Sequence, residues 1–394
     1  MPFRSPWRRA ALLGLGLATL ASTAAGQPAA GKRWVLAIQA QGGYQSDVSG
    51  LAPDEGDVLA RLGARLGYRF EVQRLRGEVG GGVGTVRYRQ FESRNQLTWI
   101  ASLQAAWDLS RRTGLEGRVG SSFGYGQAYS GVEDPAIPPD VLRRRDVGSA
   151  LLRHGFSRTL DGVVEFHGDR YDIDSDVQRL GDGWRATGRA GLEYSRRPDA
   201  LLSAFGEYER TATAGQKFEV ERLLVGWSEP VERWLVLSLG GGVARYRPID
   251  LGPVPGQPSQ EIDPEPTVTP TGGAEMTLRL GDHTVAARAA RTVGQVFGFG
   301  AVGASRELSL RYSVDLTSRL GFNAYANDVE FLEGAAVPTL VPLRNRSVRV
   351  GFRYGLTRRL DAQVDYSYWW RGEGSDVPGR HTVWVGVRRD FTWR

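Results

Sequence analysis

The feature that most constrains this chain is an alternation of apolar and polar residues that recurs in runs of about ten residues. Between Val58 and Phe70 every second residue is apolar, and arginines and glycines occupy most of the positions between them. A β-strand with this pattern has one apolar face, whereas a helix would have none. Further runs lie at 97–109, 184–194, 308–316 and 348–356. Each is long enough for a tilted strand to cross a bilayer.

The connections between the runs alternate in length. Short turns that contain Ser or Thr followed by Arg lie at 110–113, 157–161, 317–320 and 357–360, whereas long loops rich in Pro, Gly and Asp include 247–268. Together the two series predict about eighteen strands, with sixteen as the alternative, and an even number returns both chain ends to one side. We therefore predict an all-β fold, a transmembrane antiparallel up-and-down barrel without a plug or a periplasmic domain.

The first 26 residues have the features of a secretory signal. Three arginines precede the apolar segment 10–21, and small residues follow it before Gln27. We predict a cleaved signal peptide at 1–26 and a barrel at 27–394. No later apolar run approaches the roughly 20 residues that a membrane-spanning helix needs.

The composition excludes several classes of protein. The chain has no cysteine, which excludes disulfides, thiolate metal sites, cysteine nucleophiles and a lipid-modified cysteine. Lys32 and Lys217 are the only lysines, so arginine carries nearly all the positive charge. The formal net charge of +6 is small, and we predict no nucleic-acid partner.

The aromatic residues lie near the two ends of the predicted strands. Trp99 and Trp107 bracket one run, Trp184 and Tyr194 bracket another, and Tyr246 is expected at the outer end of a third. Two belts of aromatic residues are typical of the bilayer interfaces of a membrane barrel.

The signal segment, the alternating runs, the unequal connections and the last run at 381–394 together resemble a bacterial outer-membrane β-barrel of the porin type. More narrowly, the chain is similar in architecture to the eighteen-stranded barrels that accompany exopolysaccharide secretion, such as the alginate exporters. The resemblance covers the chain after residue 26. One departure is that Arg394 rather than an aromatic residue ends the chain.

The resemblance implies a location in the bacterial outer membrane, reached by export. The partners that it implies are outer-membrane lipid and lipopolysaccharide, the barrel-assembly machinery and periplasmic polysaccharide-export proteins, with acidic polysaccharide or small anions as cargo.

The polar faces of the runs predict the pore wall. Arginines outnumber acids there, and such a wall would concentrate anions and could bind the carboxylates or phosphates of an acidic polymer. The alternative is that arginines and acids on neighbouring strands neutralise one another. The predicted pore-lining residues are Arg61, Arg65, Arg69, Arg74, Arg76, Arg118, Arg185, Arg189, Arg279, Arg288, Arg311, Arg349, Arg353 and Arg388.

Three classes of function remain open at this stage. The main hypothesis is an outer-membrane channel for exopolysaccharide secretion, and the alternative is a general diffusion porin for small solutes. A barrel with an enzymatic or purely structural role is the third. His167 shares a strand face with Glu165 and Asp169, but no serine motif accompanies it, and we predict no catalytic residue.

We also predict no cofactor and no metal site. The segment 172–176 begins with the alternate aspartates of a calcium-binding loop, but Val177 stands where the glycine is required and Gly183 where the glutamate is required.

Overall fold

The computed structural model describes residues 33–46, 56–125, 142–174, 182–197, 199–213, 216–250, 265–296, 301–335, 344–371 and 379–393. The predicted signal segment lies outside these residues, as do residues 175–181 of the stretch that resembles a calcium-binding loop. The described residues form one 18-stranded sheet and a short 3₁₀ helix, η2 (Glu92–Arg94). None of the described helical residues forms a helix long and apolar enough to span a membrane.

The strands differ little in length, from 12 to 17 residues. In chain order they are β1 (Arg33–Gln45), β2 (Asp57–Val72), β3 (Leu75–Tyr88), β4 (Gln96–Asp108), β5 (Thr113–Tyr125), β6 (Leu142–Gly155), β7 (Leu160–Asp174), β8 (Gly183–Arg197), β9 (Ala200–Thr213), β10 (Gln216–Glu232), β11 (Leu235–Asp250), β12 (Thr267–Leu280), β13 (His283–Val296), β14 (Ala301–Asp315), β15 (Leu320–Ala335), β16 (Arg344–Thr357), β17 (Leu360–Arg371) and β18 (Arg380–Trp393).

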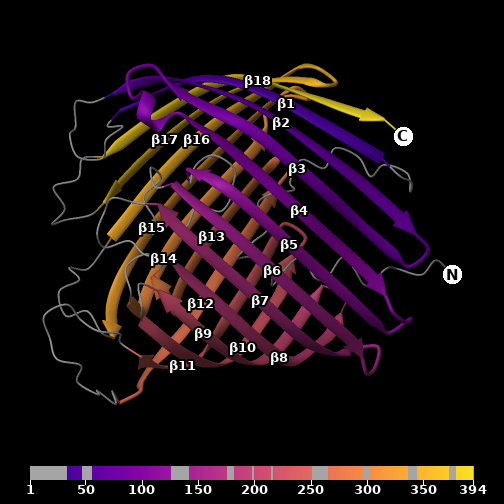
Figure 1. Cartoon of the computed structure of the whole chain (residues 1–394). Helices are drawn as coiled ribbons and strands as arrows, with labels where there is room; N and C mark the ends of the chain where they lie inside the picture. The colour runs from indigo at the N-terminus through magenta and orange to yellow at the C-terminus, as the bar shows by residue number, and fades with distance from the viewer. Residues whose placement is uncertain are drawn as a thin grey trace, which may run out of the picture.

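The sheet closes on itself. Every strand pairs antiparallel with its neighbours in the sequence, and β1 also pairs with β18, from Trp34 opposite Trp393 to Gln45 opposite Thr382. The strands run obliquely around the barrel, and the last strand lies beside the first (Figure 1). This arrangement confirms the predicted all-β up-and-down barrel and its eighteen strands, and the alternative of sixteen is wrong.

Short turns lie at one end of the barrel, which we call the turn end, and the longer connections lie at the other, the loop end. Hydroxyl groups fix the short turns. The Ser157 Oγ atom accepts hydrogen bonds from the backbone N–H groups of Thr159 and Leu160, and the Thr317 Oγ1 atom accepts them from Arg319 and Leu320. The Ser/Thr residues that recur in the short turns of the sequence are therefore explained by their ability to hold a tight turn.

The outward face of the barrel is apolar over the middle of each strand. On β2, Val58, Leu62 and Leu66 are 51%, 59% and 42% exposed, which is far more than a water-soluble protein allows for a continuous surface. Aromatic side chains border this apolar band at both ends. Those near the turn end include Trp34, Tyr68, Trp107, Trp227, Phe322 and Phe352, and those near the loop end include Tyr44, Trp99, Trp184, Tyr208, Tyr368 and Trp370.

Tyr246 corrects one detail of the predicted belts. It is only 4% exposed and lies on the inner face, in an apolar cluster with Val220 and Ala244. The sequence places Tyr246 near the end of a strand but not on the correct side, because a polar arginine flanks it on each side.

Charged residues replace the apolar ones where the strands extend beyond the band at the loop end. On β10 the outward face changes from Leu223 to Glu221 and Glu219. Glu219 accepts hydrogen bonds from the Tyr208 hydroxyl at 2.7 Å and from Arg247 at 2.9 Å. These two bonds, the tyrosine's first, hold the pKa of Glu219 below its usual value. The glutamate therefore stays charged and marks the boundary of the band.

The two faces of β4 give a direct test of this orientation. We expect Leu103→Arg, which places a charge in the apolar band, to cost about 2–4 kcal/mol of folding free energy in a bilayer. Ser102→Arg on the inner face should cost little, because Ser102 lies opposite Gly80 and Gly120 and has room. The heat-modifiable mobility of each variant in membrane fractions measures assembly. Equal tolerance of the two changes would contradict the orientation.

Candidate functional site in the barrel lumen

The strand register places nearly all of the predicted pore-lining arginines on one face. Arg118 lies opposite Gln104 and Arg311 opposite Tyr325, on the face away from Leu103 and Leu310. The same alternation places Arg61, Arg65, Arg69, Arg76, Arg185, Arg189, Arg279, Arg288, Arg349, Arg353 and Arg388 on the inner face. Arg74 is the exception. Because β2 extends to Val72 and β3 begins at Leu75, Arg74 belongs to the turn between them rather than to the wall.

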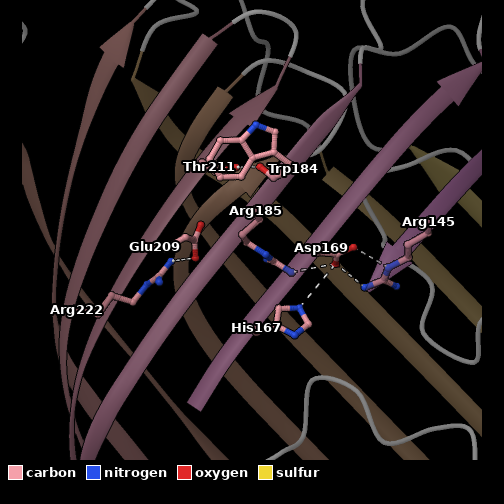
Figure 2. A network of polar contacts seen from close by, with 8 residues as sticks. All are labelled: Arg145, His167, Asp169, Trp184, Arg185, Glu209, Thr211 and Arg222. Atoms are coloured by element: carbon pink, nitrogen blue, oxygen red, sulfur yellow. Dashed lines mark hydrogen bonds and ion pairs between the residues drawn. The ribbon is translucent and has the colours of Figure 1, made fainter. Parts of the chain in front are cut away.

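One sector of the wall, formed by β6–β10, carries a network of ion pairs (Figure 2). The fully buried carboxylate of Asp169 on β7 is at its centre. Arg145 on β6 binds it through two hydrogen bonds of 2.7 and 3.1 Å, and Arg185 on β8 approaches it to 3.5 Å. The His167 ring lies 4.0 Å from the same carboxylate. A bidentate arginine pair of this kind is strong and fixed in direction.

Two further groups complete the paired sector. Arg153 on β6 contacts Glu193 at 2.8 Å and Asp161 at 3.4 Å. Arg222 on β10 contacts both Glu209, at 3.0 Å, and Glu207. Opposite charges therefore neutralise one another across these five strands, as the alternative interpretation of the sequence predicts.

Outside this sector the wall is mixed. Arg69, Arg353 and Arg388 also pair with acids there, but some other arginines do not. Arg65 on β2, Arg118 on β5 and Arg279, Arg288 and Arg311 on β12–β14 form no ion pair with any residue that the structure describes. Arg311 packs over the Tyr325 ring, at 5.8 Å from its centre. Arg288 lies directly opposite Glu275 in the ladder and interacts with it electrostatically, but the two do not form an ion pair. These arginines direct their charge into the lumen.

The lumen is narrowed from within by the loop-end parts of β13 and β14. The ladder between β12 and β13 ends at the pair Gly272–Arg291, although β12 continues to Thr267 beside β11. Beyond Arg291, β13 leaves the wall. Val293 is 2% exposed and packs in a cluster with Phe218, Val220, Ala244, Tyr246 and Ala304, of which the first four line the inner face of β10 and β11. We call residues 291–296 and 301–305 the inward flap.

Polar contacts attach the flap to the wall. Arg222 of the paired sector donates a hydrogen bond to the backbone carbonyl of Val293, which is 71 residues away in sequence. At the base of the flap, the Thr271 hydroxyl donates to the Arg291 carbonyl at 2.9 Å, and the Arg291 side chain donates to Thr269 at 3.0 Å. The opposite side of the flap is polar. It carries Thr292 and Ser305, whose hydroxyl oxygens lie 3.0 Å apart. The flap thus buries an apolar side against the wall and keeps a polar side.

The sequence interpretation missed the flap, but one residue signals it. Pro270 lies within β12, two residues from Gly272, where the pairing with β13 ends. A proline has no N–H to donate and is confined in sheets to edges and bulges. The loop-end part of β12 is such an edge, because among the described residues only β11 pairs with it there.

The histidines do not form a catalytic arrangement in the described residues. His154, His283 and His381 each pair with a hydroxyl group, of Thr113, Tyr312 and Tyr366 respectively, and no serine side chain contacts a histidine ring within this part of the chain. No group of three or more histidine, aspartate or glutamate side chains is arranged to hold a metal ion among the same residues.

Comparison with solved structures shows the fold. Pseudomonas aeruginosa OccK2 (OpdF) matches with a TM-score of 0.52 and 12% identity, over 92% of this chain and 98% of that one. Acinetobacter baumannii OccAB3 matches with a TM-score of 0.50 and 12% identity, over 92% and 99%. OccAB2 of the same organism gives 0.50 and 11%, over 92% and 98%. No family model and no curated protein sequence matches the chain.

The contact between Arg222 and the flap can be tested by conductance. We expect Arg222→Gln to weaken docking of the flap by about 1.5–3 kcal/mol, the usual value of a hydrogen bond to a charged group, and so to widen the lumen. Single-channel conductance in planar bilayers should rise and become noisier.

Arg153→Gln is the matched control. It also removes an inner-face arginine that binds two carboxylates of the same sector, but Arg153 does not contact the flap. If both variants change the conductance equally, the flap is not what narrows the lumen.

Proposed function

We propose that this protein is an outer-membrane channel that passes small hydrophilic solutes and prefers anions. The observation that carries the proposal is a closed barrel whose inner wall holds arginines that form no ion pair with a carboxylate among the described residues. The proposal corresponds to the diffusion-porin alternative of the sequence analysis rather than to its main hypothesis.

The outer surface supports the membrane location. A closed barrel satisfies the backbone hydrogen bonds of every strand without water, which a bilayer requires, and the apolar band with its aromatic borders fits the height of a lipid core. In such barrels short turns face the periplasm and longer loops face outward. The turn end is therefore the periplasmic side, and the outer face contacts outer-membrane lipid and lipopolysaccharide.

The unequal distribution of charge pairing supports the preference for anions. In the β6–β10 sector arginines and carboxylates cancel, so that sector attracts neither sign strongly. Arg65 and Arg118 form no such ion pair, and Arg288 and Arg311 interact with one carboxylate, that of Glu275, without an ion pair. Arg65, Arg118 and Arg288 lie near the middle of their strands. Guanidinium groups on a low-dielectric wall raise the local concentration of anions, and they bind carboxylates through bidentate hydrogen bonds.

The inward flap supports small solutes as cargo. Because the flap occupies part of the lumen at the loop end, a polymer chain would have to displace it, whereas a small solute passes beside it. No contact among the described residues favours a polysaccharide. The hypothesis of exopolysaccharide secretion, with its periplasmic export partners, stays a prediction from resemblance alone.

The preference for anions can be tested by removing four lumen arginines together. In the variant Arg65→Gln/Arg118→Gln/Arg288→Gln/Arg311→Gln, we expect the anion-to-cation permeability ratio to fall by about threefold or more, because the local excess of anions depends on uncancelled charge. Reversal potentials across planar bilayers in a salt gradient give this ratio.

A second variant controls for net charge. Arg144, Arg170, Arg245 and Arg247 lie on the outward face near the loop end, and each pairs with an acid there. Changing these four to Gln alters the net charge equally but should leave the ratio unchanged. A wild-type channel that prefers cations, or an equal effect of both variants, would contradict the proposal.

A further inference from the structure

The outward face of β11–β17 contains a groove that the function proposed above does not use. It has a volume of about 640 Å³, and apolar side chains line most of its length. Small side chains form much of its floor, namely Ala274, Ala287, Ala289 and Ala326, and larger ones such as Leu237 and Val348 border it. Elsewhere the outward faces carry more leucine and valine, for example on β2.

The groove runs obliquely from the turn end toward the loop end. It follows the register across the strands, through the pairs Leu237–Met276, Met276–Ala287 and Ala326–Val348. Leu237 is near the turn end of β11, whereas Val348 is near the loop end of β16. Because barrel strands are tilted, a line across them descends into the bilayer. The shape suits an extended acyl chain that enters from the outer leaflet.

The loop end of the groove is polar and aromatic. Arg346 and Trp370 line it, with the guanidinium carbon 5.8 Å from the centre of the indole ring. Asp328 lies between Arg346, at 3.5 Å, and Arg344, which donates to it at 2.8 Å. The pair of Arg306 and Glu330 lies beside these residues, so this group of five contains three arginines and two acids.

Flat rings extend this end of the groove. Tyr368 stacks on Trp370, with 4.8 Å between the ring centres, and on His381 at 4.3 Å. Aromatic faces beside arginines are suited to a sugar ring that carries phosphate, since the ring packs on the aromatic face and the guanidinium groups bind the phosphate.

We propose that this groove binds one molecule of a phosphorylated, acylated saccharide of the outer leaflet, the lipid portion of lipopolysaccharide. An acyl chain fills the alanine-floored groove, the sugar packs against Trp370 and Tyr368, and a phosphate binds Arg344 and Arg346. The inference rests on the membrane location proposed above. When a lipid occupies the groove, the charged end of the groove remains in the headgroup layer. A second copy of the barrel bound there would have to bury these charges.

The test uses the full-length protein in detergent micelles, with hexa-acylated, bis-phosphorylated lipid A as the probe and native mass spectrometry as the readout. We expect one lipid A per barrel. The variant Ala287→Phe/Ala326→Phe, which fills the groove, should reduce the bound fraction at least tenfold. So should Arg344→Gln/Arg346→Gln, and so should the use of dephosphorylated lipid A.

Matched controls separate the groove from the rest of the surface. Ala64→Phe/Ala204→Phe adds the same bulk at outward positions of β2 and β9, and Arg245→Gln/Arg247→Gln removes two outward arginines beside acids on β11. Both controls should retain lipid A. Equal retention by groove and control variants would overturn the proposal. So would dimers of the wild-type barrel that only the groove variants lose, because a second copy would then be the occupant.

Conductance distinguishes this proposal from the proposed function. The groove variants should conduct like the wild type, since no groove side chain on the outward face reaches the lumen. A wild-type barrel that binds lipid A but does not conduct would reject the channel and leave the lipid site. A barrel that conducts normally but binds no lipid A would reject the lipid site alone.

Discussion

The pairing of β1 with β18 is the contact on which the rest of the structure depends. Twelve residues of each strand face one another across this seam, from Trp34–Trp393 to Gln45–Thr382. Without it the sheet would have two long edges with unpaired N–H and C=O groups, which lipid cannot satisfy. With it, every strand has a neighbour on both sides along most of its length. The side chains are then free to be apolar on one face and charged on the other, and the lumen exists because the sheet closes.

Closure also sets the conditions for the charges inside. An arginine side chain on the inner wall can either extend into the water of the lumen or pack against the protein. Packing against the protein removes its charge from water, and this costs free energy unless a carboxylate compensates the charge. Asp169 is fully buried, and two arginines approach it. Arg65 and Arg118 occupy equivalent faces of their strands but have no such partner in the described residues. Arginine therefore stabilises the wall through ion pairs in one sector, whereas in another its charge contributes to the electrostatic potential of the lumen.

Much of this could be predicted from the sequence, because period-two alternation fixes which face a residue occupies without reference to the rest of the fold. Arg61, Arg185 and Arg349 fall on the expected face for that reason alone. Pairing is another matter. Arg65 and Arg69 share a strand and a face, yet only Arg69 meets a carboxylate, that of Glu78 at 2.7 Å. That difference depends on the register with β3, which the pattern within β2 does not contain.

The sequence interpretation also placed Arg74 in the wall, because Arg74 has the same parity as Arg76 and Glu78 on the following strand. The chain turns there instead, and Gln73 adopts a φ of 51°, a left-handed conformation typical of tight turns.

The inward flap was not predicted from the sequence for a similar reason. Val293 has the parity of an outward residue, and alternation cannot tell a strand that stays in the wall from one that folds over it. Only contacts from distant segments, such as that of Arg222, 71 residues away, separate the two.

The apolar band determines where along its length β13 leaves the wall. The outward face of β13 is apolar at Val285, Ala287 and Ala289 and becomes charged at Arg291, where β13 leaves β12. A departure nearer the turn end would expose the edge of β12 to lipid, with unpaired backbone groups that cost several kcal/mol each in such a medium. Beyond the band, water satisfies that edge, and Pro270 reduces the number of donors on it. The apolar band thus limits how deep a wall strand can fold into the lumen.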